Sequence, residues 1–237
     1  MKEQLYTIPV NDAFDQDCEC PICAMRKQLE EDAINFTMGP SYMEDDIRMV
    51  TDRIGFCEKH VGKLYENQNR LGLALMLNTH MKKTITDIEK LSQEKVAAPS
   101  LFKKKTETEN GVVSYIQKLN TSCFVCDRIE NVYKRYLATV FHCYSHDETF
   151  REKLLASKGF CTPHFGILYE MAPKELHGNV MQNFISDITK VYLNNIKRVQ
   201  EDLEWFIDKF DYRNQDAPWK NSKDALPRSM TKTNSIL

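Results

Sequence analysis

Hydrophobic positions recur at three- and four-residue steps along most of this chain, which is the spacing of amphipathic α-helices. The first half predicts helices from about residue 24 to 36 and from about 42 to 52, separated by a Gly-Pro-Ser break. Asp147 is placed to cap a short helix that runs through Leu155. The pattern therefore predicts a mainly α fold. The clearest stepwise apolar positions are Ile129, Val132, Tyr133, Tyr136, Leu137 and Val140.

Two longer apolar stripes predict long helices. The stretch from residue 174 to 210 would form about 55 Å of continuous helix at about 1.5 Å per residue. Such a stripe is typical of a helix that buries one face, and we expect the two helices to pack together as a pseudo-twofold bundle. The stripes are Leu71, Leu75, Met81, Ile85, Ile88 and Leu91, and Val180, Phe184, Ile188, Val191, Ile196, Val199, Leu203, Phe206 and Phe210.

One Cys-x-x-His phrase occurs twice in the chain. GFCEKHVGKLYE at residues 55–66 and GFCTPHFGILYE at residues 159–170 agree at eight of twelve positions. CPIC precedes the first copy and CFVC precedes the second. The Cys-x-x-Cys pairs lie 103 residues apart and the Cys-x-x-His pairs 104. This near-constant offset indicates an internally duplicated chain.

The duplicated cysteines and histidines have the spacing of Cys3His zinc sites. A Cys-x-x-Cys knuckle turns two sulfurs toward one ion. In Cys-x-x-His, the two side chains lie on the same face of a helix if the segment forms the start of one. Gly55 and Gly159 suit a sharp turn into that helix, whose backbone amides favour a thiolate. We predict two zinc ions per chain. The predicted ligands are Cys20, Cys23, Cys57 and His60 for one ion, and Cys123, Cys126, Cys161 and His164 for the other.

Three alternatives remain for these cysteines. Buried free thiols would not explain the paired histidines, and a redox dithiol at CPIC would need a preceding strand. An iron–sulfur cluster prefers four thiolates, although iron in place of zinc stays open. A complete set of four protein ligands leaves no position for water, so we expect structural rather than catalytic sites.

The repeat suggests boundaries along the chain. We expect a first unit at residues 1–95, a linker at 96–111 with a lysine run, a second unit at 112–210, and a tail at 211–237. The tail has no counterpart in the first unit. We expect Trp219 to pack back on the helices and the last ten or so residues to be disordered.

Composition and charge bear on whether the protein binds nucleic acid or crosses a membrane. The 237 residues are 42% hydrophobic and 28% charged, with a formal net charge of −2, so the overall charge does not favour nucleic-acid binding. No apolar run approaches the ~18–20 residues of a membrane span, and the amino terminus lacks the apolar region of a signal peptide. We therefore expect a cytoplasmic protein, in which eight cysteines point to metal binding rather than disulfides.

Some cysteines and histidines are not duplicated. His142 and His146 are four residues apart and would face one ion with Cys143 nearby, or else they form an exposed corner between helices. Cys18 extends the first knuckle to C-x-C-x2-C, as a spare ligand or a surface thiol. The sequence has no glycine-rich phosphate loop, no G-x-S-x-G and no H-E-x-x-H.

CPIC followed by GFCEKH, CFVC followed by GFCTPH, and the ending KFDYRNQDAPWKNSKDALPRS resemble an uncharacterised family of bacterial, internally duplicated proteins, over nearly the whole chain. Similar chains are sometimes named automatically as ABC transporter substrate-binding proteins, and the missing signal peptide argues against that name. The resemblance implies a cytosolic Cys/His protein whose eight motif positions act together. It implies no activity, substrate or partner.

Three functions fit these observations. The first is a non-enzymatic, zinc-stabilised interaction or regulatory module with a protein partner. The second is a metal- or thiol-dependent enzyme that uses His142, Cys143 and His146. The third is a zinc or redox sensor, in which Cys18 and the motif thiolates release metal on oxidation.

Overall fold

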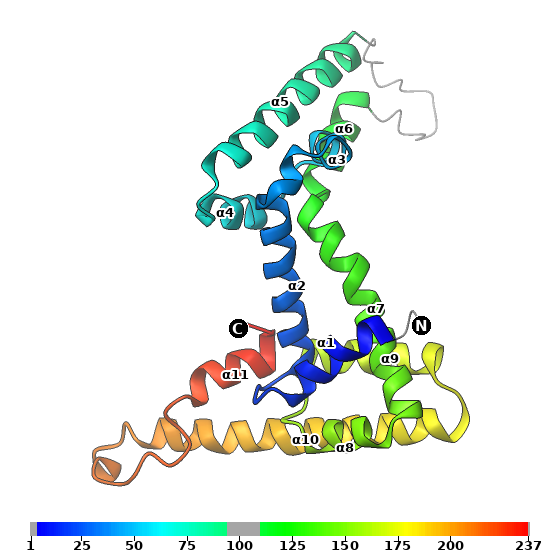
Figure 1. Ribbon diagram of the computed structural model, residues 1–237. Coiled ribbons are helices and arrows are strands. Elements are labelled where there is room, and N and C mark those ends of the chain that lie inside the picture. The colour runs from blue at the N-terminus through cyan, green and yellow to red at the C-terminus, as the bar shows by residue number, and fades with distance from the viewer. Residues whose placement is uncertain (1–3, 94–109, 237) are drawn as a thin grey trace, which may run out of the picture. The chain divides into compact units, whose positions relative to one another are not determined.

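The computed structural model describes residues 4–93 and 110–236, which form eleven α-helices, two 3-10 helices and no strand (Figure 1). The predicted mainly α fold is confirmed. The contacts divide the chain into two compact units. Unit 1 comprises residues 1–28 and 132–237, and unit 2 comprises residues 29–131.

Each compact unit contains parts of both sequence copies, and the boundary between the units falls inside two helices, α2 (Pro21–Met38) and α7 (Phe124–His146). The sequence-based unit boundaries and the pseudo-twofold packing of the long helices stay predictions. Most of the expected linker at 96–111, with its lysine run, lies outside the described residues.

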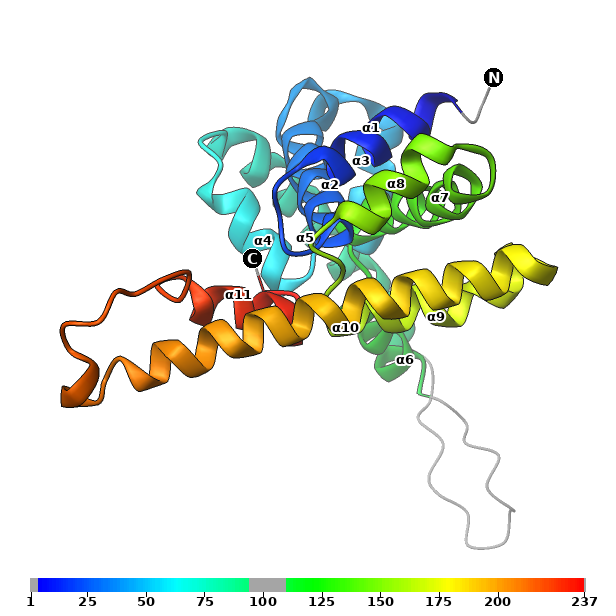
Figure 2. The same ribbon diagram turned by 90° about the horizontal axis from the view of Figure 1, so that it is seen from below.

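Unit 1 is built around its longest helix, α10. Helices α8, α9 and α11 contact α10, and α1 packs on α8 (Figure 2). Phe14 of α1 contributes to the core, with its ring centroid 4.8 Å from that of Phe150 and 6.3 Å from that of Phe160. Besides its parts of α2 and α7, the unit contains α1 (Gln4–Asp15), α8 (Glu148–Ala156), α9 (Thr162–Glu175), α10 (Gly178–Asp208), the 3-10 helix η2 (Tyr212–Asn214) and α11 (Ala225–Asn234).

The single helix predicted from residue 174 to 210 is wrong. Helix α9 ends at Glu175, and α10 has 31 residues. Leu176 and His177 are extended, and Gly178 has a φ of 56°, a conformation that glycine adopts at little cost. The bend buries Leu176, which is 5% exposed. The apolar stripe itself begins at Val180, after the bend, so it carried no evidence for a helix at residues 176–178.

Unit 2 is built around α5 (Arg70–Ser92), which contacts α3, α4, α6 and the 3-10 helix η1. Asn69 caps α5 by accepting a hydrogen bond from the Gly72 amide, and its side-chain amide donates to the Met38 carbonyl. The break predicted at the Gly-Pro-Ser sequence follows α2, and the chain forms the 3-10 helix η1 there. The other elements are η1 (Pro40–Met43), α3 (Asp45–Ile54), α4 (Glu58–Glu66) and α6 (Gly111–Thr121).

The prediction of disorder for the last ten or so residues is wrong for residues 228–234, which belong to helix α11. Helix α11 has Pro227 in its first turn, where a missing amide is tolerated. Arg228 of α11 pairs with Asp202 of α10 at 2.8 Å. Trp219 packs against Phe206 with ring centroids 6.0 Å apart, which confirms the prediction for that residue.

Candidate metal centres

The eight duplicated cysteines and histidines gather into two groups, but not the two groups that the sequence order suggested. Each Cys-x-x-Cys knuckle meets the Cys-x-x-His segment of the other copy, so the predicted division by copy is wrong. Within each group one donor atom per residue lies within 4.8 Å of all the others. Centre 1, in unit 1, consists of Cys20, Cys23, Cys161 and His164; centre 2, in unit 2, consists of Cys57, His60, Cys123 and Cys126.

Both groups have the dimensions of a tetrahedral metal site. Zinc bonds of about 2.3 Å to sulfur and about 2.0 Å to nitrogen would separate two sulfurs by about 3.8 Å, and sulfur from nitrogen by about 3.5 Å. In centre 1 the Sγ atoms of Cys23 and Cys161 are 3.7 Å apart, and Nδ1 of His164 lies 3.1 to 3.5 Å from the three sulfurs. The donor set therefore fits one ion.

Centre 2 has nearly the same dimensions. The Sγ atoms of Cys57 and Cys126 are 3.9 Å apart. Nδ1 of His60 lies 3.2 to 3.3 Å from the sulfurs of Cys57, Cys123 and Cys126. In both centres the imidazole presents Nδ1, which leaves Nε2 to a partner outside the ligand set.

The Cys-x-x-His segments open helices, as predicted. Cys57 is the N-cap residue of α4, and Cys161 is the N-cap residue of α9. The glycines two residues earlier, Gly55 and Gly159, have φ values of 64° and 75°. A Cβ on Gly159 would lie 3.1 Å from the carbonyl oxygen of Val191, so glycine is needed for space as well as for conformation. The sharp turn places each cysteine beside the first amides of its helix.

Glu30 of α2 orients the histidine of centre 2. Its Oε1 lies 3.0 Å from Nε2 of His60 and 2.7 Å from Nζ of Lys59, and Oε2 lies 2.5 Å from Nζ of Lys63. With Nδ1 facing the sulfurs, Nε2–H donates to the carboxylate, a common support for a metal-binding histidine. Burial opposes ionisation of Glu30, but the two ammonium groups lower its pKa to about 2.

Direct hydrogen bonds join the two knuckles of centre 2. The Phe124 amide donates to the Gly55 carbonyl at 3.0 Å, and the Ser122 hydroxyl donates to the Ile54 carbonyl at 2.8 Å. The Cys-x-x-Cys knuckle at the start of α7 is thus attached to the turn before α4. The ring of Phe56 in that turn also lies edge-on to Phe124, with centroids 6.4 Å apart.

Centre 1 lacks these two bonds, because Pro21 and Glu19 stand at the positions of Phe124 and Ser122. A lysine from the tail takes their place. Nζ of Lys232 donates to the Glu19 carbonyl at 2.6 Å and to the Lys158 carbonyl, and lies 3.1 Å from the Glu19 carboxylate. Lys232 is 1% exposed. The ammonium group therefore connects the residues just before both knuckles of centre 1.

The tail also reaches a ligand of centre 1 directly. The hydroxyl of Ser235 lies 3.0 Å from Sγ of Cys161 and is placed to donate to a thiolate there. Thr162, the residue after Cys161, donates from its hydroxyl to the Lys232 carbonyl at 3.0 Å. Lys232 of α11 and Ser235 at its carboxyl-terminal end thus cover this side of the centre.

The two centres differ in burial. All four residues of centre 1 are buried, whereas Cys57 and Cys126 of centre 2 are half-buried. Burial raises the pKa of the Cys20 thiol to about 12, and burial with the charge of Cys123 raises that of Cys126 to about 12. At Cys57 burial is outweighed by the helix amides and neighbouring thiols, which lower the pKa. A bound cation would offset the charge of several clustered thiolates and so lower the pKa values of these thiols.

The unduplicated candidates do not form a third group among the described residues. His142 and His146 stack on each other with ring centroids 4.5 Å apart, and Nδ1 of His146 lies 2.9 Å from the His142 carbonyl oxygen. Cys143 is 4% exposed, whereas His146 is exposed. Cys18 is half-buried and belongs to neither centre.

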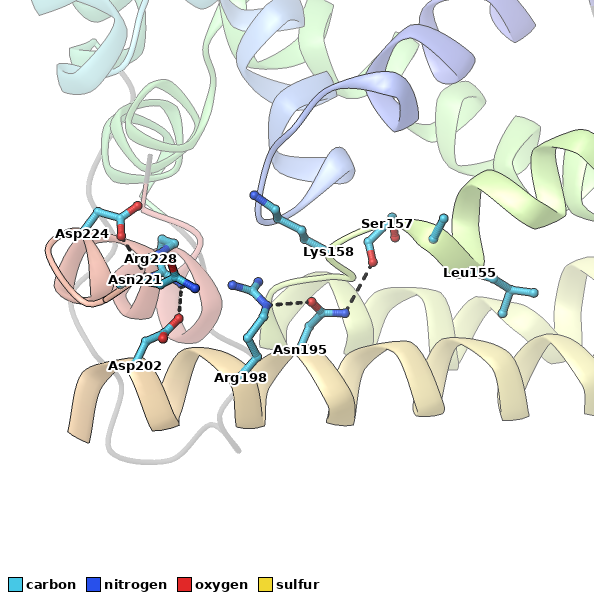
Figure 3. Close-up of a pocket in the computed structure, with 10 residues that line it drawn as sticks. Leu155, Ser157, Lys158, Asn195, Arg198, Asp202, Asn221, Asp224 and Arg228 are labelled. Carbon is cyan, nitrogen blue, oxygen red and sulfur yellow. Dashed lines mark hydrogen bonds and ion pairs between the residues drawn. The ribbon is translucent and has the colours of Figure 1, made fainter. Parts of the chain in front are cut away.

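A cleft of about 680 Å³ lies beside the tail, between α10, α11 and the segment after α8 (Figure 3). Its charged side chains are paired within the protein. Arg228 contacts Asp202 and Asp224 at 2.8 and 2.9 Å, and Arg198 contacts the carboxylate of Glu19 at 2.6 Å. The Arg228–Asp202 pair therefore attaches α11 to α10, and the Arg198–Glu19 pair attaches α10 to the segment before α2.

Sequence reasoning missed Glu30, Lys232 and Ser235. Glu30 is the first of three consecutive acidic residues, Glu30, Glu31 and Asp32, and no spacing pattern distinguishes it from the other two. For the tail there was a signal, since Asp224 followed by Ala-Leu-Pro is a plausible helix start. What Lys232 and Ser235 contact depends on segments far away in the sequence, and no spacing pattern shows it.

The fold and the two clusters define a class: a helical protein with two internal Cys3His groups, each of which could hold a metal ion. Among the described residues, no helix combines the length and the apolar character that crossing a bilayer requires. The chain belongs to a family of unknown function, DUF6062, whose family model matches residues 1–237. Neither a comparison with curated proteins nor one with solved structures gives a match.

Proposed function

We propose that this chain binds two zinc ions and that both ions are structural. The observation that carries the proposal is the geometry of the two groups, each with three sulfurs and one Nδ1 at the separations of a tetrahedral shell. In each centre, one ion would tie the start of a long helix to the turn before a short one. The free energy of binding would then be part of the free energy of folding.

The filled shells support a non-enzymatic role. Four protein ligands occupy a tetrahedral zinc ion completely, so water or substrate has no position on it. We infer an interaction or regulatory module, with a protein as its partner, that works in a reducing compartment such as the cytoplasm. Eight free cysteines in the structure suit such a compartment.

Paired variants test both the metal and the crossed ligand sets. Cys23→Ser with Cys161→Ser removes two ligands from centre 1 only, so the protein should retain about one zinc ion. Cys23→Ser with Cys57→Ser damages both centres and should leave almost no tightly bound zinc. Mass spectrometry of the native protein gives the number of ions, and elemental analysis separates zinc from iron.

If instead the Cys23/Cys57 variant kept about one zinc ion and the Cys23/Cys161 variant kept almost none, the division by sequence copy would be correct, because Cys23 and Cys57 would then share one ion. Wild-type protein without any stoichiometric metal after expression in zinc-supplemented medium would refute the proposed function itself.

A further inference from the structure

The two centres have the same set of donor atoms but differ in how far their cysteines are exposed to solvent. The Sγ–Sγ distances of 3.7 Å between Cys23 and Cys161 and 3.9 Å between Cys57 and Cys126 are nearly equal, so thiol spacing does not distinguish the centres. Access does. Cys23 is 3% exposed and Cys161 is fully buried, whereas Cys57 and Cys126 are both half-buried.

Centre 1 has an additional cover that has no counterpart at centre 2 among the residues that the structure describes. Lys232 holds the two backbone segments before its knuckles, and the Ser235 hydroxyl contacts Cys161. A hydrogen bond to a thiolate withdraws electron density from sulfur and lowers its nucleophilicity. Beside this contact, Cys161 is fully buried and Lys232 is 1% exposed. At the corresponding carbonyl in centre 2, Ser122 takes the place of the lysine. Ser122 belongs to the knuckle itself, and contributes no covering segment.

We propose that centre 2 is an oxidant-sensitive site, in which hydrogen peroxide joins Cys57 and Cys126 and releases the metal, while the tail protects centre 1. The inference rests on the proposed function, since it requires zinc in both centres. Nucleophilic thiolates with access to solvent are the ones that peroxide oxidises.

The reaction is a two-electron oxidation of the protein. The thiolates of Cys57 and Cys126 lose two electrons and form one S–S bond. Hydrogen peroxide takes up these electrons, its O–O bond breaks, and two protons from solvent complete two water molecules. Cys57 and Cys126 would then no longer serve as ligands, and a zinc ion held by His60 and Cys123 alone would be released. Closing the present 3.9 Å separation to a bond of about 2.05 Å requires a local shift of the knuckles.

The test is a time course on the full-length, zinc-loaded protein. Zinc content is measured first, and about two ions per chain are expected from the ligand sets. Hydrogen peroxide is then added in the presence of a chromophoric zinc chelator. We expect one equivalent to be released in a fast phase and the second roughly tenfold or more slowly. Peptide mapping after alkylation should find Cys57 joined to Cys126 at the end of the fast phase.

Two variants separate the roles of the tail and of the spare thiol. Ser235→Gly removes the hydroxyl bond to Cys161 and suits the φ of 58° at this position, so the fold should persist. It should accelerate the slow phase several-fold and leave the fast phase unchanged. Cys18→Ser, next to centre 1 but outside both ligand sets, should change neither phase.

Equal rates for the two equivalents, or a first disulfide between Cys23 and Cys161, would overturn the inference. An unchanged slow phase in Ser235→Gly would overturn the protective role of the tail. Absence of zinc in the starting protein would refute the proposed function, and the inference with it. A loaded protein that releases both ions together would refute the inference alone.

Discussion

Glu30 shows how one side chain outside a ligand set supports a metal centre. Its carboxylate accepts from Nε2 of His60 and is itself held by Lys59 and Lys63. This arrangement fixes the imidazole with Nδ1 toward the sulfurs and increases the basicity of that nitrogen.

Glu30→Ala should therefore weaken zinc binding at centre 2 by about 10- to 100-fold, the usual effect of losing such a partner. Zinc binding at centre 1 should stay unchanged, because the two centres share no residue. A competition titration with a chelator of known affinity measures both sites. Glu31→Ala, at the exposed neighbouring position, is the control. A similar loss at both centres would contradict the assigned role of Glu30.

At the scale of elements, Lys209 shows how the end of α10 holds the chain that follows it. Its side chain is buried, and Nζ donates to the carbonyls of Asn214, Gln215 and Ala217 at 2.5, 2.8 and 2.6 Å. The same segment contains Trp219 and lies over Trp205, the two tryptophans of the chain.

Lys209→Met should loosen this loop, because three carbonyl oxygens would lose an ammonium donor in partly buried surroundings. Unsatisfied buried groups of this kind cost about 1–3 kcal/mol each, less where water reaches them. Since both tryptophans are local, a red shift of intrinsic fluorescence and faster hydrogen exchange over residues 212–219 measure the effect. Lys223→Met, at an exposed position, should leave both readouts unchanged.

Much of the element pattern could be predicted from sequence. The cap at Asp147, the helix after it and the helices opened by Cys-x-x-His depend on local chemistry, and the structure contains them. The bend before Gly178 and helix α11 were missed. The bend serves to bury Leu176, and α11 is held by Arg228, Lys232 and their distant partners. Tertiary contacts decide such features, and periodicity does not record them.

At the scale of the whole molecule, each metal ion would connect segments that are far apart in the chain. Centre 1 joins residues separated by 138 to 144 positions, and centre 2 joins residues separated by 63 to 69. The ions therefore contribute to the long-range order of each unit and not only to a local turn.

Removal of both ions should lower the melting temperature by more than about 10 °C and broaden the transition. Structural zinc contributes several kcal/mol per site, and about 1 kcal/mol corresponds to roughly 2–4 °C for a chain of this size. Circular dichroism of zinc-loaded and chelator-treated protein, both kept reduced, measures the change. Re-addition of zinc should restore the transition. Identical melting of the two forms would show that the ions are not structural.

The members of the two clusters could be predicted from sequence, but their partition could not. Both ways of combining two Cys-x-x-Cys knuckles with two Cys-x-x-His segments use the same residue types at the same internal spacings. The choice depends on which helices pack together, and this is a property of the folded units. The duplicated pattern favoured a division by copy, because each copy alone contains three cysteines and one histidine at the spacing of a complete site.

The crossed partition has a consequence for biosynthesis. Cys20 and Cys23 emerge from the ribosome 138 to 144 residues ahead of Cys161 and His164, a delay of roughly 7–30 s at about 5–20 residues per second. Cys57 and His60 arrive earlier, with the spacing that would complete a shell around the same ion. A nascent chain that bound zinc at this stage would acquire a mismatched quartet, and both units could then close only after an exchange of ligands.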